Sequence, residues 1–523
     1  MTERPCTTER PCDSAGTTGQ RSSALAGRER IRPDRPEWAA GEIPPHRRPL
    51  PLITRDALTV RTARPTHDRL AALNEERHVG TWTPEVARLR EQGAAIRRET
   101  LTDLEKYLQQ LTGSVERNGG VVHRAGTPAE ARAVIGRIAR ENGVRLAVKS
   151  KSMATEEIHL NAHLTADGVE VVETDLGEYI VQLADERPSH IVGPALHKSR
   201  QDVADLFGQL AGDEVSGEPE DLASFARTRL RADFKAADMG ITGVNFAAAD
   251  TGTLALVTNE GNADMVTSQP RVHVAVMTVE KVIPRFADLG VLIPLLCDAA
   301  TKQRVSVYQT LVNGPRREGE TDGPDQVHLV ILDNGRTKAL GTPQEEVLAC
   351  IRCGNCQISC PVYRTVGGGH PYSAVYGGPI GAVLSPLIGD PRTGSDLPFL
   401  SSLCGACYDA CPVKIPIPDL LVDLRARHES ERPAGRTARA GWRAWALAWR
   451  TGAGFRATMA AARLAGRLLP DRLVARLPGP GRAWAEGRAL PPLREAGAFR
   501  RWFRRHEENR PGEENRPGDG RQG

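Results

Sequence analysis

The pattern of apolar and polar residues divides the chain into stretches of different periodicity. Between residues 60 and 118, apolar residues recur at mixed three- and four-residue steps, which predicts amphipathic helices. From residue 120, short Val- and Leu-rich runs alternate with helical patterns of about 10–15 residues. Residues 433–505 return to a helical pattern, rich in Arg, Ala, Leu and Trp, with a break at PGPGR, 478–482. The chain therefore combines an α/β region with helical regions before and after it.

The central stretch predicts the elements of one sheet domain. Its strands share short apolar or alternating runs and are VVHRA (121–125), RLAVKS (145–150), VEVVET (169–174), HIVGPAL (190–196), GTLALVTN (252–259), RVHVAVMTV (271–279) and VHLVILDN (327–334). The helices between them are predicted at 129–142, 155–164, 197–210 and 219–238. Thr127, Pro128 and Glu130 match a capping box with proline at the first helical position. This alternation predicts an α/β fold, with a Rossmann-like, doubly wound and mainly parallel sheet over residues 119–335.

Charge and terminal composition limit the classes of function. The 69 Lys and Arg residues against 65 Asp and Glu give a net charge of +4, too small to indicate nucleic-acid binding. No apolar run reaches the ~18–20 residues of a membrane span, and the polar N-terminus lacks the apolar core of a secretory signal. We therefore expect a cytoplasmic protein.

Both ends of the chain predict disorder. Residues 1–55 are rich in Arg, Pro, Thr and Gly and repeat TERPC, while residues 506–523 contain a repeat of EENRPG. Such segments bury too little apolar surface to offset the entropy of ordering them. Cys6 and Cys12, which lie in the first of these segments, are therefore interpreted as incidental.

Seven of the ten cysteines fall between Cys350 and Cys411, and such clustering in a large chain without a signal favours metal over disulfides. Cys350, Cys353, Cys356 and Cys360 form C-x2-C-x2-C-x3-C-P, the run of bacterial ferredoxins. Each iron of a [4Fe–4S] cube takes one thiolate, and steps of three residues direct successive sulfurs to neighbouring corners. Zinc is the competing interpretation, but a structural zinc site groups its four ligands in two pairs.

A second motif contains Cys404, Cys407 and Cys411, with Ser401 where a first cysteine would stand. In two-cluster ferredoxins, the fourth cysteine of each run ligates the other cluster. This rule assigns Cys350, Cys353, Cys356 and Cys411 to one cluster and Cys360, Cys404 and Cys407 to the other.

The second cluster is then one thiolate short, which leaves a [3Fe–4S] cluster, a non-cysteine ligand or an open iron site. Cys297 is an alternative ligand, although its apolar context, VLIPLLC, favours a buried structural thiol. The interval between the motifs contains GGGH and YGGPIGAVLSPLIG, which indicates a structured insertion. We therefore predict an α-helical ferredoxin module at 340–428, after a helical segment at 56–118 and the α/β domain, and before basic C-terminal helices at 433–505.

The α/β domain offers two weaker candidate sites. Gly240, Gly243 and Gly252 lie near strand ends, with the polar residues Asp250, Thr251 and Thr253 beside them. Backbone amides there are suited to an anionic ligand, but tight turns and close packing explain the same glycines. The charged residues of the second candidate, which follow a strand, are Lys149, Lys151, Glu156 and Glu157. Most such groups are solvated helix starts. The histidines are scattered and interpreted as structural: His159, His163, His190 and His197.

Several long segments together resemble one family. KSKSMATEEIHLNAHL, VEVVETDLGEYIVQLADERPSHIVGPALHK and MGITGVNFAAADTGTLALVTNEGN, followed by CIRCGNCQISCPVY and SSLCGACYDACPVKIPIPDL, are similar to the lactate-utilisation iron–sulfur proteins of the LutB type. The resemblance covers roughly residues 65–430. Members of this family combine a LUD domain, similar in fold to sugar-phosphate isomerases, with two ferredoxin-type motifs that also lack an eighth cysteine.

The resemblance implies an electron-transfer subunit of a system that oxidises L-lactate to pyruvate. The implied cofactors are two [4Fe–4S]-type clusters. The implied partners are a cysteine-rich-domain iron–sulfur protein and a small LUD-domain protein. Whether this chain is itself an enzyme stays open, because a shared fold does not fix an activity.

Three alternatives remain at this point. The α/β domain could itself bind and dehydrogenate a 2-hydroxy acid, with Lys149 or Lys151 holding the carboxylate. The clusters could instead be structural or redox-sensing. The C-terminal stretch GWRAWALAWRTGAGFRATMAAARLAGRLL fits an amphipathic membrane-surface helix, but we favour a helix that covers the ferredoxin module or a partner.

Overall fold

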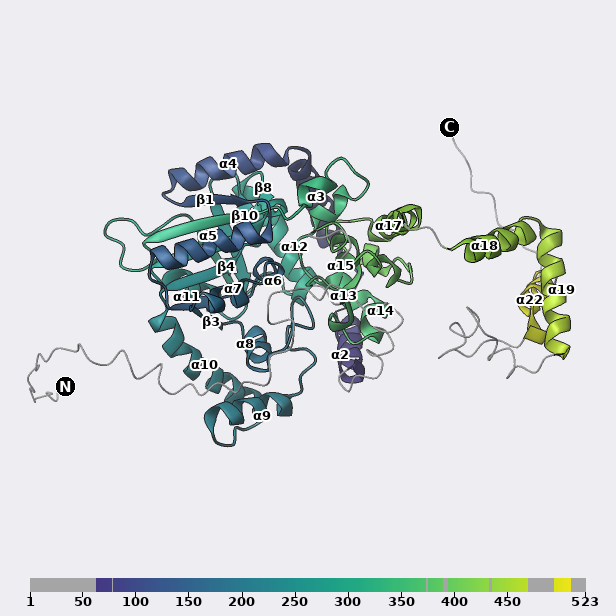
Figure 1. Cartoon of the computed structure of the whole chain (residues 1–523), viewed down its shortest axis with the longest axis horizontal. Coiled ribbons are helices and arrows are strands. Elements are labelled where there is room, and N and C mark those ends of the chain that lie inside the picture. Colours follow the sequence, from purple (N-terminus) through teal and green to yellow (C-terminus); the bar gives the residue numbers. More distant parts are fainter. Residues whose placement is uncertain are drawn as a thin grey trace, which may run out of the picture. The chain divides into compact units, whose positions relative to one another are not determined.

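The computed structural model describes residues 63–77, 79–372, 375–388, 394–431, 435–468 and 493–508 (Figure 1). The predicted disordered arm, with Cys6 and Cys12, lies outside these residues, as do residues 509–523 of the predicted tail, whereas its first residues, 506–508, are helical. Two compact units are present, residues 1–428 and 429–523, and each is described by itself.

A six-stranded parallel sheet forms the centre of the first unit, as the sequence predicts. Its strands, in spatial order, are β1 (Val121–Ala125), β10 (Gln326–Leu332), β7 (Val272–Thr278), β4 (Met239–Gly243), β2 (Leu146–Lys149) and β3 (Glu170–Glu173). The chain runs outward from β2 to β3 and then returns through β4, β7 and β10. The direction of winding therefore reverses beside β2, which is the position where open α/β sheets bind ligands.

Both faces of this sheet are covered, as doubly wound folds require (Figure 1). On one face, α5 (Pro128–Glu141), α6 (Met153–Glu157) and α7 (Leu160–Ala166) pack against strand residues such as Val274. On the other, α8 (Leu176–Leu183), α9 (Arg200–Ala211) and α10 (Pro219–Ala236) cover the β2–β3 side around Val148. Helix α4 (Leu104–Arg117) covers the remainder around Met277.

A second sheet, which the sequence pattern does not separate from the first, contains four strands. They are β8 (Val282–Ile283), β5 (Phe246–Ala248), β6 (Thr253–Thr258) and β9 (Tyr308–Val312). Strand β6 is the predicted run GTLALVTN, and it pairs antiparallel with both β5 and β9. Apolar residues from this sheet, including Phe246 and Ala255, reach the core of the cysteine region.

One predicted strand is wrong. HIVGPAL, 190–196, forms turns, because His190 Nδ1 accepts hydrogen bonds from the backbone N–H groups of Val192 and Gly193. These side-chain contacts replace the ladder that a strand would need. The predicted helix 155–164 is also broken at His159, where φ is 51°. The capping box is half formed: the Thr127 hydroxyl accepts from the Glu130 N–H, but the Glu130 carboxylate accepts from Gly126.

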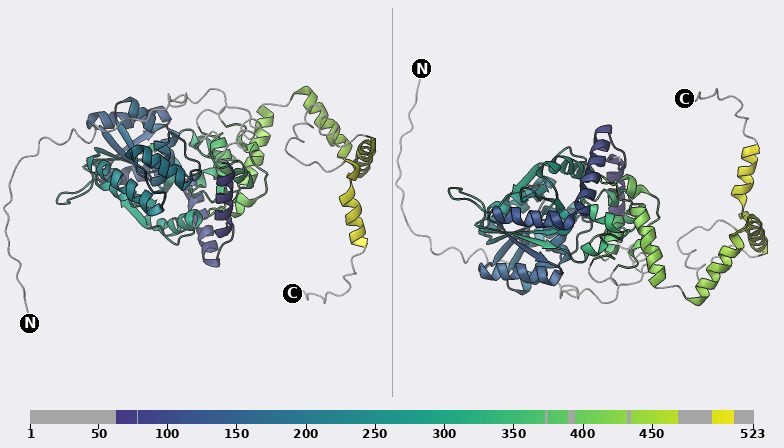
Figure 2. Two further views of the ribbon diagram at one scale, coloured as in Figure 1. Left: turned by 90° about the horizontal axis from the view of Figure 1, so that it is seen from below. Right: turned by 90° about the horizontal axis from the view of Figure 1, so that it is seen from above.

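Most of the remaining helices of the first unit form one core with the cysteines. They include α2 (Ala63–Glu76), α3 (Pro84–Thr102), α11 (Asn262–Ser268), α12 (Leu289–Thr301), α13 (Asn355–Ser359), α14 (Pro361–Thr365), α15 (Gly378–Leu384), α16 (Ala406–Asp409) and α17 (Ile417–Glu431). All but α11 contribute to that core or pack beside it, and Figure 2 shows α2 and α3 next to the cysteine helices. Arg97 of α3 is fully buried and donates hydrogen bonds to the carbonyls of Val282, Leu348 and Ala349. This arginine joins the sheet domain to the segment that leads into the first cysteine.

The second unit consists of exposed helices. α18 (Arg436–Trp449) and α19 (Gly452–Leu468) contain no buried residue, and α22 (Ala498–Glu508) follows them. On α18, the rings of Trp442, Trp445 and Trp449 follow one another with centroids 5.8 and 5.0 Å apart. Among the described residues, no helix combines the length and apolar content that crossing a membrane would take.

Candidate metal centre

The first cysteine loop is built by two left-handed residues. Cys350 ends the 3-10 helix η5 (Glu345–Ala349), and the chain then passes through Arg352 at φ 64° and Gly354 at φ 75° before α13 begins. Glycine is required at position 354, because a Cβ there would lie 2.8 Å from Ile191. The loop therefore curls, and its three cysteines point to one side.

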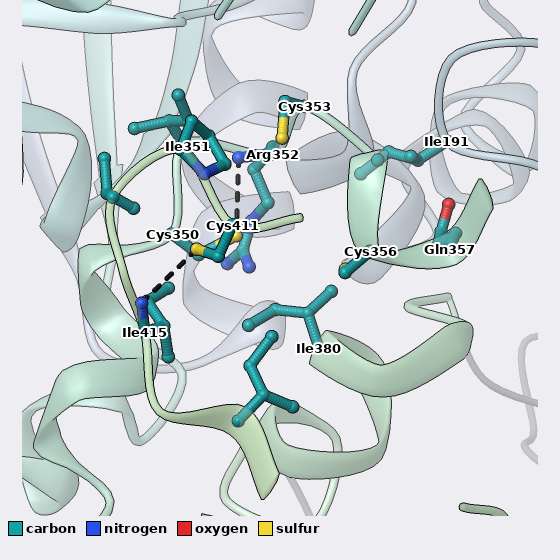
Figure 3. Close-up of a pocket in the computed structure, with 14 residues that line it drawn as sticks. Ile191, Cys350, Ile351, Arg352, Cys353, Cys356, Gln357, Ile380, Cys411 and Ile415 are labelled. Atoms are coloured by element: carbon teal, nitrogen blue, oxygen red, sulfur yellow. Dashed lines mark hydrogen bonds between the residues drawn. The ribbon is translucent and has the colours of Figure 1, made fainter. Parts of the chain in front are cut away.

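Four cysteines from both motifs line a single cavity (Figure 3). They are Cys350, Cys353, Cys356 and Cys411. The other walls of this cavity are mostly apolar side chains: Ile191, Ile351, Ile380, Val413, Ile415 and Ile417. The structure thus brings together the four thiols that the crossing rule assigns to one cluster.

The other three cysteines form a neighbouring group. Cys360 caps α14 and is buried, Cys407 lies buried in α16, and Cys404 is exposed just before α16. Burial and the thiols of Cys360 and Cys404 raise the pKa of Cys407 to about 12. Burial also raises the pKa of Cys360, and the Cys404 thiol adds to that effect. Cys360 and Cys407, together with the other four cysteines of the two motifs that are at least partly enclosed, also belong to or pack against one hydrophobic core.

The two groups are adjacent to each other. The pKa of Cys356 is raised well above the usual value by burial, by Cys353 and Cys350 of its own group, and by Cys407 of the other. Burial raises the pKa of Cys411 to about 11, partly offset by backbone hydrogen bonds. Crowded, buried thiols of this kind become thiolates when cationic iron replaces their protons.

The donor set fits iron–sulfur clusters. Thiolates select soft metals and iron–sulfur clusters, and backbone N–H groups that donate to sulfur tune such clusters. The N–H of Arg352 donates to Cys350 Sγ at 3.4 Å, that of Tyr363 to Cys360 Sγ at 3.4 Å, and that of Ile415 to Cys411 Sγ at 3.3 Å. A site for a single metal ion is a different matter: across the described part of the chain, no group of three His, Cys, Asp or Glu side chains could hold one such ion.

Cys297 stays apart from both groups. It lies in α12, where 3% of its surface is exposed, and it does not line the cavity. Burial raises its pKa, and a hydrogen bond with Ser306 is the main opposing influence. A structural thiol is the interpretation that this environment favours.

A buried network of charges, missed at the sequence level, reaches the cavity. Arg352 pairs with Glu280 at 2.8 Å, and Glu280 pairs with Arg336 at 3.1 Å. Arg336 also pairs with Glu157 at 2.5 Å, and Glu157 accepts a hydrogen bond from the Tyr376 hydroxyl at 2.7 Å. The expectation that Glu157 is a solvated helix start is therefore wrong. The sequence offered one signal for Glu157, namely that it follows strand β2. Polar residues that follow parallel strands meet at the same edge of the sheet.

Neighbouring cations keep Glu280 ionised although it is buried. Burial alone would raise the pKa of Glu280, but Arg336, Arg352 and Lys281 outweigh it and hold that pKa at about 2. Burial, together with the neighbouring Arg352, lowers the pKa of Lys281 to about 7, against the opposing influence of Glu280. The guanidinium of Arg352 also lies 4.7 Å from the centroid of the Tyr376 ring. A permanent cation therefore stands at the wall of the cavity.

Lys149, the first candidate for binding a substrate carboxylate, is already fully engaged. It is 0% exposed, it pairs with Glu156 and Glu173 at 2.7 Å each, and it donates to Thr155 at 3.1 Å. Lys151, the second candidate, donates to the carbonyl of Val192 at 2.8 Å. The structure therefore gives no support to Lys149 as a carboxylate ligand.

The glycines of the sheet domain have structural causes. A Cβ on Gly240 would lie 1.9 Å from the carbonyl oxygen of Val266, and one on Gly252, at φ 74°, would lie 2.8 Å from the Ser114–Val115 backbone. Gly243 likewise faces Ser152. The polar residues beside them serve local contacts: Asp250 accepts from the Phe286 N–H, and Thr251 donates to Thr253. Close packing therefore explains this motif without an anionic ligand.

The four histidines singled out in the sequence lie in local structural settings. His159 occupies a left-handed turn, and His163 lies in α7. His197 pairs with Glu186 at 2.6 Å. His190, besides shaping its turn, lies beside Gly354, and burial with nearby Lys151 and Arg77 lowers its pKa to about 3.

Comparison with known proteins agrees with the geometry. Residues 108–332 match the LUD domain, and residues 346–415 match a 4Fe-4S dicluster domain. The chain is 45% identical over 446 residues to lactate utilization protein B of Geobacillus thermodenitrificans, covering 84% of this chain and 91% of that protein. It is 45% identical over 460 residues to the Bacillus pumilus protein of the same name, covering 87% and 95%.

Among solved structures, a DUF162 family protein from Deinococcus radiodurans aligns with 44% of this chain and 98% of its own, at 13% identity and a TM-score of 0.25, from which nothing is concluded. The resemblance that the sequence motifs indicate is confirmed by the full-length relatives. With a LUD domain, a dicluster domain and 45% identity over more than four-fifths of its length, the chain belongs to the lactate utilization protein B family.

Proposed function

We propose that this chain relays electrons through two neighbouring iron–sulfur clusters during the oxidation of L-lactate to pyruvate. The observation that carries the proposal is the division of seven cysteines into two adjacent groups, one of them lining a cavity that both motifs build. Each iron–sulfur cluster accepts one electron at a time. Two neighbouring clusters can therefore together accept the two electrons that lactate releases.

The ligand assignment is part of this proposal. Cys350, Cys353, Cys356 and Cys411 would hold a [4Fe–4S] cluster, and Cys360, Cys404 and Cys407 would hold a second one. Bound clusters supply reversible one-electron chemistry. The chain contributes mostly apolar walls, N–H groups that donate to sulfur, and the cation of Arg352, whose side chain is 9% exposed, beside the first cluster.

The exposure of the second group suggests where electrons enter or leave. Cys404 is exposed, whereas the first group is buried except for the partly exposed Cys350. Electron transfer falls steeply with distance, so the group nearer the surface is the natural contact for a partner. We propose a cysteine-rich-domain iron–sulfur protein and a small LUD-domain protein as partners in a lactate system, in keeping with the name of the relatives.

Oxidation of lactate to pyruvate releases two electrons and two protons, and we place that step on a partner. In the sheet domain, the first candidate carboxylate ligand, Lys149, is neutralised by Glu156 and Glu173. A cytoplasmic location is also proposed, because the eight cysteines of the described residues form no disulfide with one another, as expected in a reducing compartment.

The test uses the full chain, purified without oxygen and mixed with its two partners. L-lactate should bleach the absorbance of the clusters near ~400 nm, the region of thiolate-to-iron charge transfer. Dithionite added afterwards measures all reducible clusters. Cys353→Ser and Cys407→Ser should each reduce the bleached fraction, and Cys297→Ser is the matched control. Bleaching by dithionite but not by lactate, with intact partners present, would refute the lactate assignment.

A further inference from the structure

Ser401 occupies the structural position of a cluster ligand. In the first loop, the N–H of Arg352 donates to Cys350 Sγ at 3.4 Å. In the second loop, the N–H of Leu403 donates to Ser401 Oγ at 3.1 Å. In each loop, the N–H of a residue donates to the side chain two positions before it. Ser401 Oγ therefore takes the place in the second loop that Cys350 Sγ takes in the first.

The backbone around the next cysteine repeats as well. Arg352 and Gly354 flank Cys353 with φ values of 64° and 75°. Leu403 and Gly405 flank Cys404 with φ values of 55° and 87°. A leucine in the left-handed region costs free energy and is therefore held there by its surroundings.

The helix that follows each loop starts in the same way. Gly354 is the N-cap of α13, and its carbonyl accepts from the Gln357 N–H at 2.9 Å. Gly405 is the N-cap of α16, and its carbonyl accepts from the Tyr408 N–H at 2.8 Å. The correspondence between the loops therefore extends from Ser401 through Cys407.

The backbone at Ser401 is fixed from outside the loop. Arg425 of α17 donates through Nη2 to the Ser401 carbonyl at 2.8 Å and through Nε to the Pro398 carbonyl at 2.9 Å. Ser401 itself is half-buried. The backbone that carries the hydroxyl is therefore held in place, and the hydroxyl itself accepts from the Leu403 N–H.

We propose that Ser401 Oγ is the fourth protein ligand of the second cluster. This inference rests on the proposed assignment of Cys360, Cys404 and Cys407 to that cluster, which leaves one iron without a thiolate. On coordination, one Fe–O bond forms, the O–H bond of Ser401 breaks, and the proton passes to water near the exposed Cys404. No electron moves in this step. The second cluster is then a four-iron cluster with three thiolates and one alkoxide.

The experiment compares the full-length chain with Ser401→Ala, Ser401→Cys and, as the matched control, Ser402→Ala, which alters the adjacent exposed serine. All four are loaded with clusters without oxygen, assayed for iron and sulfide, and then oxidised mildly with ferricyanide. Loss of the iron that lacks a protein ligand produces a [3Fe–4S] cluster, which electron paramagnetic resonance detects independently of any activity.

The wild type and Ser402→Ala should keep the iron content of two four-iron clusters and give little [3Fe–4S] signal. Ser401→Ala should lose one iron from one cluster and give a several-fold larger signal, and Ser401→Cys should suppress it again. A wild type that already holds a [3Fe–4S] cluster, or a Ser401→Ala variant that behaves as the wild type, would overturn the inference while leaving the electron relay intact.

A second oxygen donor lies close to Cys360 and provides a further check. The ring of the buried Tyr372 lies with its centroid 5.7 Å from that of Tyr363, whose backbone N–H donates to Cys360 Sγ. A Tyr372→Phe variant should retain the second cluster as the wild type does. Conversion to the three-iron form in Tyr372→Phe but not in Ser401→Ala would assign the ligand to the tyrosine. A wild type that takes up no cluster would overturn both this inference and the relay.

Discussion

Glu280→Gln is expected to destabilise the first unit severely although Glu280 belongs to neither cysteine group. Its carboxylate is 0% exposed and lies between the guanidinium groups of Arg336 and Arg352. The substitution keeps the shape of the side chain but removes the negative charge, so two buried cations face each other without the counter-ion between them. Breaking a buried pair in this way costs roughly 3–5 kcal/mol.

The pKa of Glu280 gives an independent magnitude. Burial would raise this pKa, but Arg336 and the other cations lower it from 4.5 to about 2. A depression of this size corresponds to about 3 kcal/mol of folding free energy at neutral pH. Because the folded-state pKa is below the unfolded one, the contribution is complete above about pH 5. It is lost as the pH falls from about 4.5 towards 2.

The assay is urea unfolding of the cluster-loaded full-length chain, followed by circular dichroism without oxygen. Glu105→Gln is the matched control, because Glu105 pairs with Arg124 at 2.8 Å while its side chain stays 60% exposed. It should cost at most ~1 kcal/mol. The difference between wild type and Glu280→Gln should also be constant between pH 8 and 9, above the pKa of about 7 of the neighbouring Lys281. Equal shifts in the two variants, or a Glu280 effect that varies across that pH range, would refute the reasoning.

Three further predictions follow from separate contacts. Arg352→Gln removes a largely buried cation from the cavity wall and should lower the reduction potential of one cluster by on the order of 50–100 mV in an anaerobic redox titration; an unchanged potential would show that the charge is screened. Gly252→Ala should cost at least ~2 kcal/mol in urea unfolding, whereas Gly143→Ala, also at positive φ but with open space around its Cβ, should cost about 1 kcal/mol; the two would be equal if backbone conformation alone mattered. Cys297→Ser should leave the iron and sulfide content unchanged, and a loss of iron would make this thiol a ligand.

The buried network also connects the two parts of the first unit. Glu157 ends α6, Glu280 follows β7, Arg336 follows β10, and Arg352 lies within the first cysteine loop. These groups therefore couple the carboxyl edge of the parallel sheet to the cavity wall. A ligand or partner that displaced any member of this chain of charges would change the electrostatic potential at the first cysteine group.

Short-range sequence pattern was sufficient for the features that depend on neighbours along the chain. The spacing of Cys350, Cys353 and Cys356 fixes how three thiols can point from one loop, and the period of Val272–Thr278 fixes a buried strand. Even the substitution of Ser401 for a cysteine is visible in the aligned motifs. The α/β class, the cysteine module and the helices around them follow from such local patterns.

Tertiary contacts decided what the same residue types do. Glu156 and Glu157 are adjacent in sequence, yet one pairs with Lys149 and the other with Arg336, 179 residues away. HIVGPAL has the apolar content of a strand, but turns around His190 place Ile191 in the cavity wall instead. Local periodicity indicates which side of a segment is buried, but it does not indicate which other residues that side packs against. Burial beside a distant opposite charge, a distant backbone or a ring of thiols exists only once the chain has folded.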